Sequence, residues 1–220
     1  MNEFLIMVMT TKSYKDRQDS IRQTWFKDAD VLFYSDHKDV DTYMVCVESD
    51  YSSGVIKQSR ILKHIQDGLV KFNEKNALEY KWIFFVDDDT YVNPIYFKKI
   101  ISNFDENIIY GHIWDHKYKY PEESWGWKDP FLLSGGAGML ISIKNINNIK
   151  DYSFPKEVWG GDQALTQICR RNGMIFQQAK EFHPENINKY SGIDSDPNVN
   201  VTYHWMNADD VYSTYKKILQ

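Results

Sequence analysis

The chain has 220 residues, of which 42% are hydrophobic and 15% aromatic, and its formal net charge is -5 at pH 7. This length and composition are typical of one globular domain with a sizeable core, and no apolar run reaches the roughly 18 residues of a membrane-spanning helix. The negative charge argues against a nucleic-acid-binding protein, which normally presents a basic face. The opening MNEFLIMVMTTK has too short an apolar stretch and no basic start, so it predicts a buried strand and not a secretory signal.

Apolar runs and helical spacings then alternate along the chain. The predicted strands are 4–9, 31–34, 43–47, 82–86, 107–111, 139–143 and 174–178. The predicted helices are 16–26, 55–72, 94–103, 163–172 and 208–219. We expect Gly173 to end the fourth of these helices and Asn207 to cap the start of the last. In the second helix, one apolar stripe joins Val55, Leu62, Ile65, Leu69 and Phe72.

This order predicts an α/β fold with a mostly parallel central sheet and helices on both faces, in a single domain of residues 1–220. The polar stretches 116–130 and 183–200 are predicted to be long loops. The two cysteines, Cys46 and Cys169, lie in apolar segments without metal-ligand spacing, so we expect buried thiols in a reducing compartment.

Three consecutive carboxylates end the fourth predicted strand, in the segment WIFFVDDDTYVNP. On an extended backbone Asp87 and Asp89 point to the same side and Asp88 points to the other. Two carboxylates on one side suit Mg²⁺ or Mn²⁺, with substrate phosphates completing the coordination. A solvated turn after a buried strand is the alternative, and ligands of such sheets do collect at the carboxyl ends of the strands.

The chain resembles the Fringe-like and β1,3-glycosyltransferase family of GT-A enzymes, which includes Fringe, the β1,3-galactosyltransferases and core 1 galactosyltransferase. The resemblance depends on five blocks in a fixed order: TTKSYKDRQDSIRQTW, WIFFVDDDTYV, SGGAGMLIS, GGDQALTQICRRNG and VTYHWMNADDVYSTY. The blocks span nearly the whole chain. The resemblance implies a GT-A fold with a nucleotide-binding half, about 1–93, and an acceptor-binding half, about 94–220.

The resemblance also implies a divalent ion, Mn²⁺ or Mg²⁺, held on the diphosphate of a UDP-sugar. Asp89 matches the main ligand, and Asp87 and Asp88 match residues that contact the donor or the metal. His204 matches the family's C-terminal metal-binding histidine, and a neutral imidazole suits Mn²⁺. Without the resemblance, His204 would be interpreted as a core histidine, and His183 is a competing ligand.

Asp162 matches the catalytic base of the family. From the residues alone it is a first-turn or N-cap carboxylate of the helix that follows, stabilised by the helix dipole. The two interpretations are compatible, because an ionised Asp is what must accept the proton of an acceptor hydroxyl. The family usually has a second acidic residue just before this Asp, where this chain has Gly161.

The remaining predicted contacts are with the nucleotide and the sugars. Thr10, Thr11 and Arg17 match residues that grip the nucleotide, and Asp36 is a further uridine candidate. The resemblance also includes the glycines of SGGAG, which let the backbone approach a ligand closely. We expect Gly135 and Gly136 to line the donor-sugar or acceptor pocket. One of four tryptophans is expected to stack on a sugar: Trp114, Trp125, Trp127 or Trp159.

The resulting hypothesis is an inverting, metal-dependent glycosyltransferase that moves a hexose or N-acetylhexosamine from a UDP-sugar to an acceptor hydroxyl, forming a β1,3 linkage. Its partners would be the donor and a glycan or hydroxylated acceptor, with neither nucleic acid nor a membrane segment. A metal-dependent phosphohydrolase or nucleotidyltransferase, and a noncatalytic glycan-binding module, are the alternatives. We expect a cytoplasmic enzyme, or the soluble catalytic domain of a longer protein.

Overall fold

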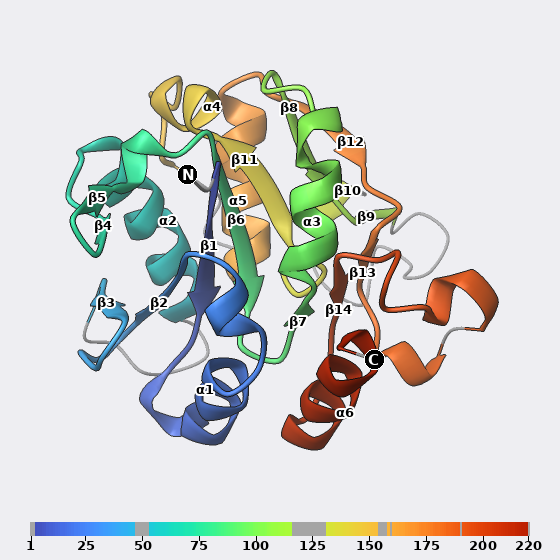
Figure 1. Ribbon diagram of the computed structural model, residues 1–220. Coiled ribbons are helices and arrows are strands. Elements are labelled where there is room, and N and C mark those ends of the chain that lie inside the picture. Colours follow the sequence, from blue (N-terminus) through green and yellow to red (C-terminus); the bar gives the residue numbers. More distant parts are fainter. Residues whose placement is uncertain are drawn as a thin grey trace.

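A seven-stranded sheet forms the centre of the molecule (Figure 1). The computed structural model describes residues 3–46, 53–115, 131–153, 158, 160–189 and 191–219. In spatial order the strands are β12 (Ile175–Gln178), β8 (Ile108–Gly111), β11 (Met139–Ser142), β6 (Trp82–Asp87), β1 (Phe4–Met9), β2 (Val31–Ser35) and β3 (Thr42–Met44). Strand β11 runs antiparallel to both of its neighbours, and all other neighbouring pairs are parallel. The prediction of a mostly parallel sheet is confirmed.

Helices cover both faces of this sheet. They are α1 (Lys15–Arg22), α2 (Ser53–Gln66), α3 (Pro94–Ile100), α4 (Ile143–Asn147), α5 (Gly161–Arg171) and α6 (Ala208–Ile218). Side chains alternate between the faces along each strand, so Phe4 and Ile6 of β1 pack in one core with residues of α1, α3 and α6. Leu5 and Met7 face the other core, which α2, α4 and α5 cover.

Short elements complete the fold. Two small antiparallel sheets pair β4 (Lys71–Phe72) with β5 (Lys75–Asn76), and β9 (Ile113–Asp115) with β10 (Phe131–Leu133). The 3-10 turns are η1 (Lys12–Tyr14), η2 (Trp25–Asp28), η3 (Ala77–Glu79), η4 (Ile101–Asn103), η5 (Ile187–Lys189) and η6 (Gly192–Ser195). A small sheet has the order β13 (Phe182–His183), β14 (Thr202–Tyr203), β7 (Tyr91–Val92).

This small sheet links the two halves of the chain. Strand β7 follows the three carboxylates directly, and Tyr91 pairs with Tyr203 of β14. Just beyond the pair, the Met206 amide donates to the Asp89 carbonyl over 2.9 Å. His204 therefore lies beside the acidic triplet, although more than a hundred residues separate them in the sequence.

The second predicted helix, 55–72, is too long. Helix α2 begins at Ser53 and ends at Gln66, and Leu69, assigned to the buried stripe, is 57% exposed. The reason is Gly68, whose φ of 69° lies in the left-handed region that glycine adopts without strain. The Gly68 amide donates to the Ile65 carbonyl and the Leu69 amide to the His64 carbonyl, the Schellman arrangement that stops a helix.

Other boundaries follow the predicted signals more closely. Gly173 ends α5 with a φ of 71°, and the Asn207 side chain accepts from the Asp210 amide at the start of α6, as expected. Helix α4 was not predicted; it begins where the Ser142 side chain accepts from the Asn145 amide. The predicted helices 16–26 and 94–103 each divide into an α-helix and a 3-10 turn.

Of the two predicted loops, 183–200 contains η5 and η6, and 116–130 lies outside the described residues. Cys46 and Cys169 are both buried thiols, as expected. No helix in the described part of the chain combines the length and the apolar character that crossing a membrane requires.

Candidate active site

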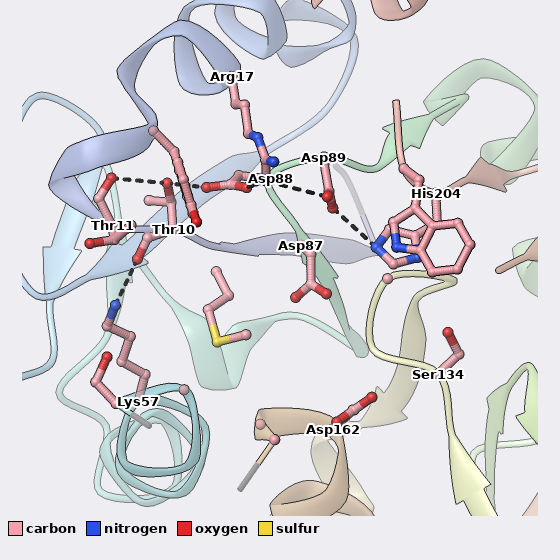
Figure 2. A pocket seen from close by; sticks show the side chains of 18 of the residues that line it. Thr10, Thr11, Arg17, Lys57, Asp87, Asp88, Asp89, Ser134, Asp162 and His204 are labelled. Atoms are coloured by element: carbon pink, nitrogen blue, oxygen red, sulfur yellow. Dashed lines mark hydrogen bonds and ion pairs between the residues drawn. The ribbon is translucent and has the colours of Figure 1, made fainter. Parts of the chain in front are cut away.

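A cavity of about 590 Å³ opens at the carboxyl ends of β1 and β6, where the first residues of α2 and α5 also meet. Strand register places these parts together, because Met9 at the end of β1 pairs with Asp87 at the end of β6. Figure 2 shows side chains from both halves of the chain around the same space, with Thr10 and Lys57 on one side and His204 on the other.

Two carboxylates and one imidazole converge on one wall of the cavity. One ligand atom from each of Asp87, Asp89 and His204 lies within 4.8 Å of the other two. His204 Nε2 is 3.1 Å from Asp89 Oδ1, and His204 Nδ1 is 3.2 Å from the Pro184 carbonyl oxygen. Since a carbonyl only accepts, Nδ1 carries the proton, and a neutral His204 would present the Nε2 lone pair toward the carboxylates.

Asp88 points away from that cluster. It is buried, and its carboxylate accepts from Thr10 Oγ1 over 2.6 Å and from Arg17 Nη1 over 2.9 Å. The same Arg17 nitrogen lies 3.2 Å from Asp89 Oδ2, and the guanidinium stacks 4.4 Å from the Tyr14 ring centroid. Arg17 therefore neutralises part of the acidic triplet and fixes the orientation of two of its members.

The carboxylates of the triplet differ in proton affinity. Burial raises the pKa of Asp87 to about 7; the charge of His204 opposes this, while Asp89 and Asp162 add to it. Burial raises the pKa of Asp88 to about 6 in spite of its bonds to Thr10 and Arg17. The crowded negative charge is the pattern expected of a site that accepts a cation.

Asp89 and His204 behave as an ion pair. Burial acts to raise the pKa of Asp89, but the hydrogen bond and charge of His204, with the charge of Arg17, outweigh it and the pKa is lowered. Burial acts to lower the pKa of His204, but the bond to Asp89 outweighs it and the pKa is raised. A divalent ion placed between these residues would replace the proton of His204 as the partner of Asp89.

Asp162 lies in the first turn of α5 and lines the cavity. Its Oδ1 accepts from the Gln163 amide over 2.8 Å and its Oδ2 from the Gly135 amide over 3.3 Å. Burial raises the pKa of Asp162, and these backbone hydrogen bonds oppose the rise. The helix terminus expected to keep Asp162 ionised is therefore present, but burial has the larger effect and moves the pKa in the direction of a better base.

Of the two glycines expected to line the pocket, Gly136 belongs to the cavity lining and Gly135 does not, although both lie against cavity residues. A Cβ at Gly136 would meet His204 Nε2 at 2.1 Å, and one at Gly135 would lie 3.0 Å from the Asp162 Cβ and 3.5 Å from Asp87 Oδ2. Gly161 lies at the helix junction, where a Cβ would be 3.0 Å from the Gly54 carbonyl oxygen. Gly161, which stands where the resemblance implies an acidic residue, is thus the residue that lets α5 approach α2.

The predicted nucleotide residues divide into two groups. Thr10, Thr11 and Arg17 line the cavity. Asp36 is buried behind them and is not part of the lining; its carboxylate accepts from Thr11 Oγ1 over 2.9 Å and from Ser35 Oγ over 2.7 Å. Burial acts to raise the pKa of Asp36, but these bonds and the charge of Lys57 outweigh it and the pKa is lowered. Asp36 holds Thr11 in place.

The competing histidine, His183, belongs to the core. Its ring stacks on Tyr203 with centroids 5.1 Å apart, and its Nε2 lies 2.8 Å from Asn200 Oδ1. The cluster of possible metal ligands contains His204 and not His183. The difference follows from the β13–β14 pairing, which turns His183 into the protein and leaves His204 at the cavity.

The cavity lining also contains residues that the sequence did not single out, among them Lys57 and Trp205. Trp205 is 53% exposed and has a φ of 56°, an uncommon conformation for a large side chain. Its position next to His204 was the available signal. Trp114 lines the cavity, and its stacking on a sugar stays a prediction; Trp125, Trp127 and Trp159 lie outside the described residues.

Two of the solved structures that share this architecture match almost the whole chain. One is a glycosyltransferase involved in the glycosylation of the major capsid of PBCV-1, which is 13% identical, with 96% of this chain and 98% of that chain covered and a TM-score of 0.50. The other is the galactosyltransferase LgtC in complex with donor and acceptor sugar analogs, 12% identical, with 98% and 96% covered and a TM-score of 0.51. At these identities the likeness defines the fold, which is the GT-A glycosyltransferase fold.

The family assignment comes from the sequence. The family model described as Fringe-like matches residues 1–217, so the chain belongs to the Fringe-like family and is a glycosyltransferase. No curated protein sequence matches the chain.

Proposed function

We propose that the chain is an inverting, metal-dependent glycosyltransferase that transfers a hexose or N-acetylhexosamine from a UDP-sugar to an acceptor hydroxyl, with a β1,3 linkage as the expected product. The observation that carries the proposal is the shared cavity, which has Asp87, Asp89 and His204 on one wall and Asp162 on another. A cation site and an isolated carboxylate are the two groups that such a reaction needs.

The donor set suits a divalent ion. Asp87 and Asp89 offer carboxylate oxygens and His204 a ring nitrogen, a combination that Mn²⁺ accepts and that Mg²⁺ accepts less readily because of the nitrogen. When bound, the ion supplies Lewis-acid stabilisation of the charge on the departing diphosphate. Asp88 would act indirectly, since Thr10 and Arg17 occupy its carboxylate.

Asp162 would act as the general base. Backbone amides of Gln163 and Gly135 fix its carboxylate, so one oxygen can be aimed at an acceptor hydroxyl without loss of side-chain order. The proton of the acceptor would pass to Asp162 as the hydroxyl oxygen bonds to the anomeric carbon and the diphosphate departs. Attack opposite the leaving group inverts that carbon, and an α-linked donor would give a β-linked product.

The nucleotide would lie over Thr10, Thr11 and Arg17, in the half of the cavity built from residues 1–93. Residues 94–220 contribute Asp162, His204, Gly136 and Trp114, and would receive the acceptor. Asp36 supports this surface through Thr11 and is assigned no direct uridine contact.

The two alternative functions have less support. A phosphohydrolase or nucleotidyltransferase would need neither a sugar acceptor nor the Fringe-like sequence pattern, and a glycan-binding module would need no acidic cluster. Membership of the Fringe-like family favours the transferase over both. Two buried thiols support the expectation of a reducing compartment, and hence a cytoplasmic enzyme.

The proposal is tested with Asp162→Asn. This variant keeps the shape of the side chain but accepts no proton, so we expect sugar transfer to fall by about 10²- to 10⁴-fold while UDP and Mn²⁺ still raise the melting temperature. Asp89→Asn should instead lose the Mn²⁺ stabilisation. Released UDP and product linkage are measured with a panel of UDP-sugars and acceptors.

Asp209→Asn is the matched control, because Asp209 is also a first-turn carboxylate but is exposed on α6. It should leave transfer unchanged. Undiminished transfer by Asp162→Asn would remove the base assignment, and a wild-type protein that releases no UDP with any donor and acceptor would remove the transferase proposal.

A further inference from the structure

Lys57 is a buried cation that faces the cavity. It belongs to α2, its side chain is only 5% exposed, and it contributes to the cavity lining. Burying an ammonium group is costly unless its charge and its three donors are satisfied. Lysine is rarely found at such a position without a partner of its own.

The described contacts satisfy Lys57 only in part. Nζ donates to the Thr10 carbonyl over 3.1 Å, and Asp36 Oδ1 lies 3.8 Å away, beyond hydrogen-bond distance. That Asp36 oxygen already accepts from Ser35 Oγ over 2.7 Å and lies 3.3 Å from the Lys12 amide nitrogen. The ammonium therefore has hydrogen-bonding capacity left on its cavity side.

The charges around the cavity indicate what Lys57 would bind. Arg17, which with Lys57 supplies the arginine and lysine side chains of the described cavity lining, donates to Asp88 and lies beside Asp89. Among the described residues, Lys57 has no carboxylate oxygen closer than that of Asp36 at 3.8 Å, and it lies next to Thr10 and Thr11, across the cavity from His204 (Figure 2). An anionic ligand placed between the Asp87–Asp89–His204 wall and Lys57 would have positive charge on both sides once a metal ion is bound.

We propose that Lys57 binds a phosphate oxygen of the UDP-sugar donor and is a specificity-determining residue for the diphosphate. The inference rests on the proposed function, since it assumes a nucleotide diphosphate in this cavity. A lysine ammonium is a compact point charge suited to phosphate oxygens. The hydrogen bond from Nζ to the Thr10 carbonyl would hold the Lys57 side chain in position before the donor arrives.

The test compares Lys57→Gln with the wild type by calorimetry in the presence of Mn²⁺. We expect the dissociation constant for UDP to rise at least tenfold, while that for uridine and the melting-temperature shift caused by Mn²⁺ alone stay unchanged. Lys57→Arg, which keeps the charge, should bind UDP more tightly than Lys57→Gln. Lys63→Gln is the matched control, because Lys63 is an exposed lysine of the same helix paired with Asp67.

A second measurement does not depend on a variant that folds. Reductive methylation of the wild-type protein, followed by mass spectrometry, should modify Lys57 more slowly when UDP and Mn²⁺ are present, and uridine should give no protection. Equal rates with and without UDP would overturn the inference.

Three results would contradict the assignment to phosphate. If Lys57→Gln binds UDP as tightly as the wild type does, Lys57 does not bind phosphate. If the affinities for UDP and for uridine fall equally, Lys57 acts on the nucleoside and not on the diphosphate. If the affinity falls for the UDP-sugar but not for UDP, Lys57 contacts a sugar hydroxyl. If the wild type binds no UDP at all, the proposed function fails instead, whatever Lys57 does.

Discussion

Gly136 shows how a single missing side chain shapes the candidate metal site. Thr90 Oγ1 donates to the Gly136 carbonyl over 2.8 Å and fixes the turn, which brings its backbone against the His204 ring. No side chain other than hydrogen fits there, because a Cβ would come within 2.1 Å of the ring nitrogen that faces Asp89. The turn at Gly136, which precedes β11, therefore sets the position of His204, a proposed metal ligand.

We predict that Gly136→Ala displaces His204 and weakens metal binding. The expected result is loss of most of the melting-temperature increase that Mn²⁺ gives to the wild type, with the overall fold retained by circular dichroism. The control is Gly192→Ala: its φ of 64° makes alanine strained, but no atom of the described residues lies within 4 Å of the added Cβ, and Gly192 is not among the residues that line the cavity.

Gly192→Ala should thus lower the melting temperature of the metal-free protein and leave the Mn²⁺ shift intact. If Gly136→Ala keeps the full Mn²⁺ shift, His204 is not a ligand, or the turn is free to move by more than its hydrogen bonds suggest.

At the scale of elements, two glycines define helix α2. Gly68 determines where the helix ends, and Gly54 determines how closely it packs against α5. Gly68 provides the left-handed residue of the Schellman motif, so α2 stops before Leu69 reaches the predicted stripe. Gly54, near the start of the same helix, packs against the start of α5, where its Cβ position is 3.6 Å from the Gly161 nitrogen. This packing aligns the first turns of two helices that both line the cavity.

We predict that alanine at these two glycines has different effects on the free energy of unfolding. Gly68→Ala should lower the free energy of unfolding by about 1–2 kcal/mol, because the left-handed conformation is unfavourable for alanine. Gly54→Ala should not lower it, because the added Cβ makes ordinary van der Waals contact and helical alanine is favoured over glycine by about 0.5–1 kcal/mol. Urea unfolding followed by circular dichroism measures both, and an equal loss for the two variants would contradict this account.

At the scale of the whole molecule, metal binding and stability should depend on pH in opposite directions. The pKa of Asp87 is raised to about 7 and that of His204 is raised as well, so the metal-free native state binds more protons than the unfolded state at pH 6. The stabilisation that comes from these protons is fully present below the pKa values of the unfolded state. It is lost as pH rises through the pKa values of the native state. A metal ion needs the deprotonated forms of both groups.

We therefore predict that the metal-free protein melts at a lower temperature at pH 8 than at pH 6, and that the Mn²⁺ shift is larger at pH 8. Below pH 7 the apparent Mn²⁺ affinity should fall by about tenfold per pH unit for each proton displaced. Asp87→Asn should reduce the pH dependence of the metal-free melting temperature. A Mn²⁺ shift that is equal at pH 6 and pH 8 would exclude Asp87 and His204 as a joint binding site.

The sequence by itself determined the features that depend on neighbouring residues. Period-two alternation is a property of an extended chain, so the strands ending at Met9 and Asp87 could be located. Asp88 and Asp89 lie in a turn beyond the end of β6, so the extended backbone assumed for them was wrong and alternation did not decide which way they point. Gly173 and Asn207 were predictable because helix caps depend on a few local hydrogen bonds. The five blocks were sufficient to indicate the family, which the match over residues 1–217 confirms.

Only the tertiary structure decided which distant residues share the cavity. His204 and His183 have similar sequence surroundings, and the register of β7, β14 and β13 turns one to the acidic wall and the other into the core. Asp36 lies behind Thr11, whereas Lys57 lies in the cavity lining. Their positions depend on how β1, β2 and α2 pack together, which the sequence near either residue does not show. Such contacts depend on long-range pairing, which no local periodicity encodes.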